Sequence, residues 1–305
     1  MIRTKSGAAG LSIASNSVLI VLKLVAGAIT GSIAILTEAI HSGIDLLASV
    51  IAFFSVRAAD EPADREHPYG HEKVENMAAA IEGMLILVGA GIIIFEATKR
   101  LINSSEVEHL GIGIAVIGFS AVANLCVSTF LYRRAKALNS PALEGDAAHL
   151  RTDAMTSGGV LLGLVLVEVT GEPAFDSIAA LAVAAAIVYT GFNILIGSGR
   201  VLVDQAPPAA ELDQIERAIA SERAHHPEIA GYHKLRARGA GARRYIDLHL
   251  QFQSGTTLEL AHQLAHQVRE AIEAEVPRSE VLIHTEPEQS LRPPEVESRG
   301  PYRAG

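Results

Sequence analysis

Two histidine–aspartate pairs have the spacing of metal ligands on a helix. His41 precedes Asp45 by four residues, and the same spacing separates His149 from Asp153. Positions i and i+4 lie on one face of an α-helix, with about 5–6 Å between their Cβ atoms, so both side chains of a pair can reach one cation. Two facing pairs provide two nitrogens and two oxygens, the number of ligands that tetrahedral Zn²⁺ takes. The alternative is that both pairs lie near helix ends and contact water.

Both pairs lie inside long apolar segments, where an ionisable side chain is costly to bury and indicates a functional site. Such segments fill the first two thirds of the chain, and each has close to the ~20 residues that a bilayer-spanning helix requires. The same spacing in two of them favours a shared metal site over the helix-end alternative. We predict six transmembrane helices, at about 9–30, 33–56, 77–98, 110–132, 144–169 and 176–198.

The composition agrees with a membrane protein that carries a soluble appendage. Hydrophobic residues make up 49% of the 305 residues, and the mean hydropathy is +0.29. The formal net charge of −9 argues against a nucleic-acid-binding role. Cys126 is the single cysteine, which excludes an intrachain disulfide and a zinc site built from cysteines.

Basic residues in the short loops predict the orientation, because cytoplasmic loops carry an excess of Lys and Arg. With the N-terminus inside, eight basic residues fall on the inner side and two on the outer side. We therefore expect a multi-pass protein of the cell inner membrane or plasma membrane, with both termini in the cytoplasm. The inner residues are Arg3, Lys5, Arg57, Arg65, Lys73, Arg133, Arg134 and Lys136, and the outer ones are Lys99 and Arg100.

The last third of the chain reads as a small cytoplasmic α+β domain with the order α-β-β-α-β. The expected domains are a transmembrane domain over 1–203, a cytoplasmic metal-binding domain over 204–290 and a disordered tail over 291–305, which is rich in Pro, Gly and charge. Hydrophobic periodicity predicts the elements of the domain. They are a helix over 209–224, strands over 231–238 and 243–253 around a turn at 239–242, a helix over 258–275 and a strand over 280–285.

A second group of possible metal ligands lies in the short polar loop after the second apolar segment. Asp64, His67 and His71 have a 3,4 spacing there. Pro68 and Gly70 favour a turn, which lets all three side chains converge on one cation. The alternative is an ordinary solvated loop.

A third group lies in the cytoplasmic region, where four histidines fall on separate predicted elements and two acidic residues lie near two of them. These side chains form one or two metal sites, or else they are surface histidines on solvated faces. The residues are His233, His249, His262 and His284, with Asp247 and Glu286.

Taken together, these motifs resemble those of the cation diffusion facilitator family over about residues 8–287. The most specific matches are the stretches IHSGID, HLRTD, DREHPYGHEK and VLIHTEP. The resemblance implies a homodimeric transporter that exports divalent metal ions in exchange for protons. It also implies the six transmembrane helices and the cytoplasmic domain expected above.

The resemblance assigns metal ligands in three places. The two helical motifs correspond to the transport site, the loop motif to a second site, and the cytoplasmic domain to a binuclear site at the dimer interface. Relatives often have Asp at the position of Glu286. The implied ligands are His41, Asp45, His149 and Asp153 in the transport site, Asp64, His67 and His71 in the loop, and His233, His249, His262, His284 and Glu286 in the cytoplasmic domain.

The transport ligands favour Zn²⁺ as the transported and bound ion. Many relatives have Asp where this chain has His41, and imidazole suits Zn²⁺, Cu²⁺ or Ni²⁺ better than the oxygen-preferring Mn²⁺ or Mg²⁺. Export selective for Cd²⁺, Co²⁺, Fe²⁺ or Mn²⁺ is the alternative, and the affinity order by itself does not exclude Cu²⁺.

Two other classes of protein also place His and Asp in apolar helices. An intramembrane metallohydrolase needs a zinc site with an open coordination position and a nearby general base. Here each pair supplies its own fourth ligand, which favours a carrier over an enzyme. A metal sensor that uses its membrane part only as an anchor is the other alternative, and six spans with buried ligands are more than an anchor needs.

Overall fold

The computed structural model describes residues 4–30, 33–103, 112–172 and 174–288. Within these ranges the side chains of some helical residues, including His41, are outside the description. The chain divides into two compact units, Met1–Gly199 and Arg200–Gly305. The tail expected over 291–305 lies outside the described residues.

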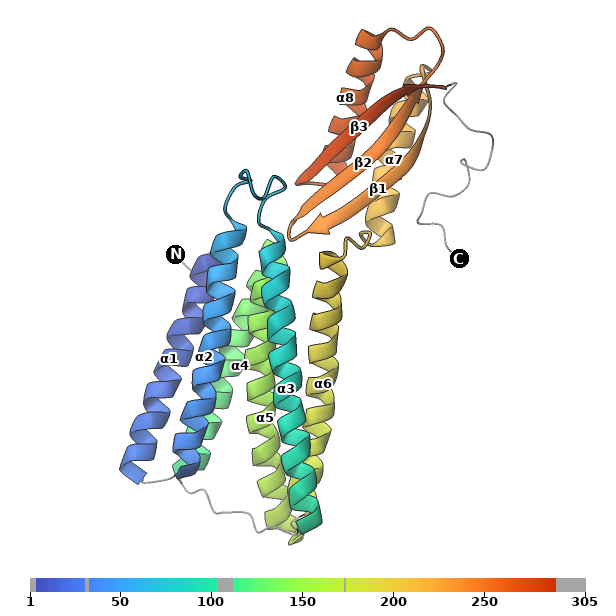
Figure 1. The fold of residues 1–305 in the computed structure, drawn as a ribbon. Coiled ribbons are helices and arrows are strands. Elements are labelled where there is room, and N and C mark those ends of the chain that lie inside the picture. Colours follow the sequence, from blue (N-terminus) through green and yellow to red (C-terminus); the bar gives the residue numbers. More distant parts are fainter. Residues whose placement is uncertain (1–3, 31–32, 104–111, 173, 289–305) are drawn as a thin grey trace. The chain divides into compact units, whose positions relative to one another are not determined.

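The first unit consists of long helices that run alongside one another (Figure 1). Five of them contain a whole apolar segment predicted from the sequence, and the fourth helix contains 112–132 of the segment predicted at 110–132, whose first two residues lie outside the described ranges. They are α1 (Lys5–Thr30), α2 (Ile33–Ala59), α3 (Lys73–Asn103), α4 (Ile112–Leu138), α5 (Pro141–Thr170) and α6 (Ala174–Leu202).

Three stretches of the described helices are long and apolar enough to cross a membrane. They are Lys5–Val25, Lys73–Lys99 and Ser177–Leu202. The other three spans stay a prediction. Large apolar side chains such as Val88, Phe95 and Tyr189 are exposed on this unit, which is the arrangement expected where lipid surrounds the helices.

Many of the buried residues inside the helical unit are small. Ala8, Ala78 and Ala135 are almost completely buried in one apolar cluster between the helices. At another contact, a Cβ added to Gly83 of α3 would lie 3.1 Å from the backbone nitrogen of Leu195, on α6. Small side chains of this kind let helix backbones approach closely in a bilayer.

The second unit has the predicted order α-β-β-α-β. In its three-stranded sheet the second strand is central, antiparallel to the first and parallel to the third. The predicted turn at 239–242 is a tight hairpin, in which Gly241 has a φ of +53° that a glycine adopts without strain. The elements are α7 (Ala209–His225), β1 (Ile229–Ala240), β2 (Arg243–Phe252), α8 (Leu258–Glu275) and β3 (Ser279–Pro287).

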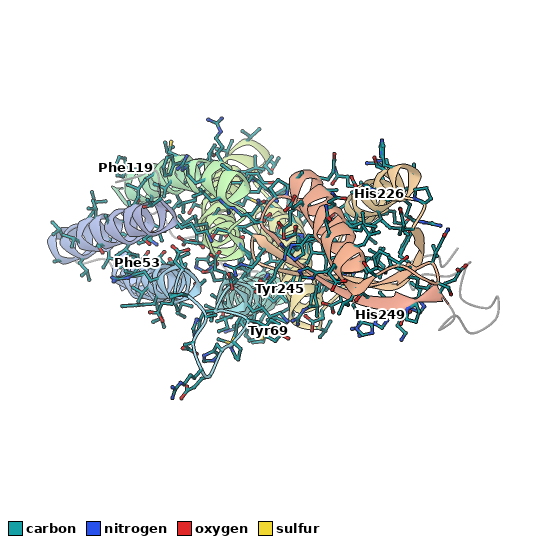
Figure 2. All side chains as sticks on the ribbon, turned by 90° about the horizontal axis from the view of Figure 1, so that it is seen from above. Phe53, Tyr69, Phe119, His226, Tyr245 and His249 are labelled. Carbon is teal, nitrogen blue, oxygen red and sulfur yellow. The ribbon has the colours of Figure 1, made fainter. Side chains whose placement is uncertain are left out.

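Alternation along β2 separates the apolar core from the polar face of the sheet. Ile246, Leu248 and Leu250 are buried in the cluster that also contains the apolar faces of α7 and α8. Because successive strand residues point to opposite faces, His249 lies on the other face. Figure 2 shows its side chain on the side of the sheet away from His226, which follows α7. One face of this sheet is therefore covered by helices, and the other carries histidines.

Candidate metal sites

The helical motifs bring two carboxylates and an imidazole together inside the bundle. The Nε2 atom of His149 on α5 lies 3.2 Å from the Oδ1 atom of Asp45 on α2. Ligand atoms of Asp45, His149 and Asp153 all lie within 4.8 Å of one another. Asp45 and His149 are each only 6% exposed. Two helices that are far apart in the sequence thus present three possible ligands to one point.

The fourth expected ligand, His41, lies one turn before Asp45 on α2. Its side chain is outside the described residues, so its place at the site stays a prediction. The Nδ1 atom of His149 is buried and has no hydrogen-bond partner within the described residues. The imidazole is therefore held by the carboxylate of Asp45 on one nitrogen only.

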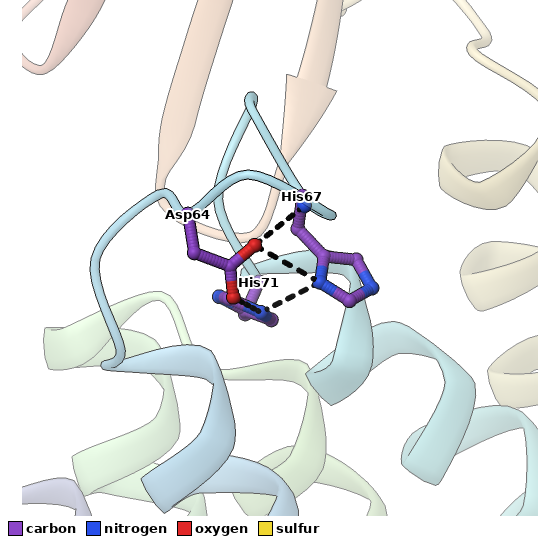
Figure 3. Close-up of side chains that lie close together, drawn as sticks. All are labelled: Asp64, His67 and His71. Carbon is purple, nitrogen blue, oxygen red and sulfur yellow. Dashed lines mark hydrogen bonds and ion pairs between the residues drawn. The ribbon is translucent and has the colours of Figure 1, made fainter.

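The loop between α2 and α3 gathers its three candidates as the turn chemistry predicts (Figure 3). The Oδ1 atom of Asp64 accepts a hydrogen bond from the backbone N–H of His67 at 2.6 Å. The Nε2 atom of His71 lies 3.0 Å from Nδ1 of His67 and 3.5 Å from Oδ2 of Asp64. Gly70, with a φ of +87°, allows the chain to fold back between the two histidines.

The same hydrogen bonding prepares the loop carboxylate for a cation. The backbone hydrogen bond from His67 lowers the pKa of Asp64 below its ordinary value of 3.8. Asp64 therefore carries a negative charge at neutral pH, as a metal ligand must. Asp64 and His67 are exposed, so an ion can reach this cluster from solvent.

The polar face of the sheet holds a third cluster, formed by one side chain from each strand. His233 on β1, His249 on β2 and Glu286 on β3 place ligand atoms within 4.8 Å of one another. The Nδ1 atom of His249 lies 3.3 Å from Oε2 of Glu286, and Nε2 of His233 contacts Oε1 of the same carboxylate. Gln251 donates a further hydrogen bond to Glu286 at 3.2 Å. The pairing of the strands is what aligns these residues.

The pKa of Glu286 reflects these contacts. Burial of the carboxyl group tends to raise its pKa, but the hydrogen bond from His249 and the charge and hydrogen bond of His233 outweigh burial. The result is a pKa below the ordinary value of 4.5. Glu286 is thus held as a carboxylate between two imidazoles.

The other two cytoplasmic histidines are placed differently. The ring of His284 lies 4.7 Å from that of His249, at the edge of the cluster. His262 is on α8, which packs on the opposite, apolar face of the sheet, and its ring lies 4.4 Å from that of His266. Within one described chain, His262 is therefore not part of the cluster. Asp247 also lies apart from it and faces Arg236 at 3.4 Å.

Sequence reasoning missed two buried acidic residues of the bundle, Glu82 on α3 and Asp146 on α5. Both are completely buried. Asp146 could have been found, because it precedes His149 by three residues and shares its helix face. Glu82 could have been found as one of two acidic residues inside the apolar segment predicted at 77–98.

Comparisons with known proteins agree with this architecture. The protein-family model of the cation efflux transmembrane domain matches residues 10–203. The family model of the cation efflux protein cytoplasmic domain matches residues 207–288. An uncharacterized transporter of Synechocystis sp., sll1263, is 34% identical over 277 residues, 91% of this chain and 88% of the relative. The cation-efflux pump FieF of Salmonella schwarzengrund is 32% identical over 285 residues, 93% of each chain.

A solved structure of CzrB in its zinc form covers 29% of this chain and 98% of its own, with 27% identity and a TM-score of 0.27. A TM-score this low carries no weight for the fold.

The chain belongs to the cation efflux family, the cation diffusion facilitators. It is a multi-pass membrane protein with a C-terminal cytoplasmic domain of helices and strands. Members of this family are transporters and not enzymes, which excludes the metallohydrolase alternative.

Proposed function

We propose that this protein exports divalent metal ions, Zn²⁺ foremost, from the cytoplasm in exchange for protons. The observation that carries the proposal is the convergence of Asp45, His149 and Asp153 from α2 and α5 inside the bundle. The buried carboxylate of Asp45 and the half-buried carboxylate of Asp153 beside an imidazole suit a doubly charged ion, because buried charges need to be paired or bound to a metal. His41 supplies the fourth ligand from the turn before Asp45.

The donor set supports Zn²⁺ as the preferred ion. Two imidazole nitrogens and two carboxylate oxygens match its tetrahedral coordination. Cd²⁺ and Co²⁺ accept the same donors, whereas Mn²⁺ prefers a shell made of oxygen. We therefore expect Cd²⁺ and Co²⁺ to be carried as well, and Mn²⁺ to be carried less well.

Proton coupling follows from competition at the imidazoles. A histidine must be neutral to bind a metal, so metal binding releases protons and protonation releases metal. In the proposed cycle, metal loads from the cytoplasm onto neutral His41 and His149, and protons from the outer side displace it. Asp45 and Asp153 balance the charge of the ion while it is inside the bundle. Alternating access by the helices then links inward proton flow to outward metal flow.

The orientation proposed here has both termini in the cytoplasm, which follows from the excess of basic residues in the inner loops. The loop cluster around Asp64 and the sheet cluster around Glu286 then face the cytoplasm. We propose that they bind cytoplasmic metal, and that the cluster on the sheet stabilises a homodimer. His262 lies on the other face of the sheet, so it joins such a site only through contact between two chains.

The experiment is zinc transport by purified protein in proteoliposomes that carry an imposed pH gradient. His149→Ala and Asp45→Ala should each abolish zinc-dependent proton flux. His225→Ala is a matched control, because that imidazole is exposed on α7 and belongs to none of the three proposed metal sites. Full transport by His149→Ala or by Asp45→Ala would end the assignment of the site.

A further inference from the structure

A network of hydroxyl, amide and carboxyl groups joins three helices of the bundle next to the transport site. The Oδ1 atom of Asp146 on α5 accepts hydrogen bonds from Ser49 of α2 at 2.9 Å and from Ser12 of α1 at 3.1 Å. Asn16 of α1 donates to Ser49 at 2.8 Å. All four side chains are buried. Only one oxygen of Asp146 is used, and its Oδ2 atom has no hydrogen-bond partner within the described residues.

Glu82 of α3 meets α5 at Gly145, the residue before Asp146. If Gly145 carried a Cβ atom, that atom would lie 2.1 Å from Oε2 of Glu82 and 3.3 Å from Cα of Ala79. The glycine next to Asp146 therefore makes room for the carboxyl group of Glu82. The two acidic groups are close enough to interact electrostatically.

Both oxygens of Glu82 lack a hydrogen-bond partner in the part of the chain that the structure describes. The contrast with Glu75, which lies two helical turns away on the same side of α3, is direct. Glu75 is just as buried, but Lys5 donates to one of its oxygens at 2.5 Å and Ser140 donates to the other. Among the described residues, neither Glu82 nor Asp146 forms an ion pair of this kind, and His149 acts on Asp146 through its charge alone. Two buried carboxyl groups with three unused oxygens are costly unless they hold protons or a cation joins them.

The position of the pair relates it to the transport site. Asp146 precedes His149 by three residues, a rise of about 4.5 Å along α5. That direction leads to Pro141, the first residue of α5, and α3 begins at Lys73 directly after the loop that holds Asp64. Glu82 and Asp146 thus lie between the loop end of the bundle and the three transport ligands.

We propose that Glu82 and Asp146 form an additional divalent-cation site, made of oxygen ligands, through which the transported ion passes between the loop end of the bundle and Asp45, His149 and Asp153. The inference rests on the proposed function, because it assigns a route to the same cargo. Two carboxylates balance the charge of the ion, and the hydroxyls of Ser12 and Ser49 complete an oxygen environment. Oxygen ligands suit Mn²⁺ better than imidazole ligands do, so Mn²⁺ is a suitable probe of such a site.

The test is an equilibrium count of Mn²⁺ ions bound to the full-length protein in lipid nanodiscs, from the electron paramagnetic resonance signal of free Mn²⁺. Wild type should bind one more Mn²⁺ per chain than Glu82→Gln or Asp146→Asn. Both substitutions keep the shape of the side chain. Glu96→Gln, an exposed position on the same helix α3, should bind as wild type does.

Gly145→Ala tests the geometry without removing a charge. The added methyl group should displace the carboxyl group of Glu82 and remove the same Mn²⁺ ion. His149→Ala should retain that ion although it loses zinc transport, which separates this inference from the proposed function. Mn²⁺ counts are compared only for variants whose size-exclusion profiles and melting temperatures show that they are folded.

Equal Mn²⁺ counts for wild type, Glu82→Gln and Asp146→Asn would overturn the proposal. So would variants that change proton release on zinc binding while they leave the Mn²⁺ count unchanged, because the pair would then hold protons only. Loss of the ion in both acidic variants and in Gly145→Ala, with retention in Glu96→Gln, would support it.

Discussion

The contact between His149 and Asp45 defines the chemistry of the site at the scale of single residues. Nε2 of the imidazole and Oδ1 of the carboxylate are 3.2 Å apart, the distance of a hydrogen bond. A divalent ion must take the place of the proton in that hydrogen bond to bind to both. The same pair of atoms can therefore hold either a metal ion or a proton, and this exclusivity is what an antiporter requires.

We expect the metal preference to depend on having His rather than Asp at position 41. In His41→Asp the transport site would hold three carboxylates and one imidazole, a harder donor set that favours Mn²⁺. We expect the ratio of zinc flux to manganese flux to fall by about tenfold or more, which is the range for changes in the environment of a bound metal. Parallel flux assays with both ions measure the ratio. A ratio equal to that of wild type would show that residue 41 does not contribute to selectivity.

At this scale, the spacing rule selected three side chains that converge in the structure, and it did not predict that Glu82 and Asp146 lie close together. The four-residue spacing placed Asp45, His149 and Asp153 on facing helix surfaces, and these three meet. Asp146 and Glu82 come from helices whose relative rotation and height no spacing within one helix encodes. Their proximity depends on the packing of α3 against α5 at Gly145.

At the scale of elements, the close contact between α3 and α6 depends on glycine. A Cβ at Gly83 would lie 3.1 Å from the backbone nitrogen of Leu195 and 3.2 Å from the carbonyl oxygen of Gly191. Backbone atoms cannot rotate away as a side chain can. The helices must therefore separate to admit even a methyl group.

We expect Gly83→Ala to destabilise the bundle by about 1–3 kcal/mol, the usual penalty of overpacking, reduced by the better helix propensity of alanine. Gly89→Ala on the same helix is the matched control, since a Cβ there meets nothing within 4 Å. The control should be neutral or more stable. Thermal unfolding of both variants in the same detergent compares them, and equal melting temperatures would contradict the packing account.

The sheet cluster predicts a specific acid sensitivity of the cytoplasmic domain. The pKa of Glu286 is lowered in the folded state, so its charged form stabilises the fold above the ordinary value of 4.5. That contribution is lost as the pH falls through the lowered value. Metal-free domain 204–290, which contains its own apolar core, should therefore lose stability on acidification more steeply than its Glu286→Gln variant.

Urea unfolding of the two forms at a series of pH values below neutrality would measure the difference. Glu280→Gln controls for the loss of one carboxylate from the same strand, because that side chain is exposed. Parallel curves for wild type and Glu286→Gln would show that the contacts with His233 and His249 do not stabilise the fold.

The elements of this domain were predictable because their patterns are local. Alternation over Tyr245 to Phe252 and the helical period after Thr257 identify a strand and a helix from neighbouring residues alone. The meeting of His233, His249 and Glu286 is not local, because it depends on the register between three strands. For this cluster the sequence supplied the candidate residues and the resemblance supplied the grouping.

At the scale of the whole molecule, we expect metal binding to the cytoplasmic domain to affect assembly. His262 is separated from the sheet cluster by the thickness of its own domain. If it completes a site, the partner subunit must bring it there. Zinc should then favour the dimer of the protein, because the free energy of zinc binding would add to the free energy of dimer formation.

Light scattering of the 204–290 domain during a zinc titration tests this link. We expect zinc to shift the domain toward the dimer in wild type and to do so more weakly in His262→Ala. His226→Ala provides a matched control on α7's side of the domain. A mass that does not respond to zinc would leave the sheet cluster without a role in assembly.

The most direct test of the account is the flux of Zn²⁺ and of Mn²⁺ in proteoliposomes at two pH gradients. We predict that zinc flux exceeds manganese flux, that it increases with the opposing proton gradient, and that it disappears in His149→Ala. Zinc flux that ignores the proton gradient, or that persists without His149, would contradict a carrier in which α2 and α5 hold one ion in competition with protons.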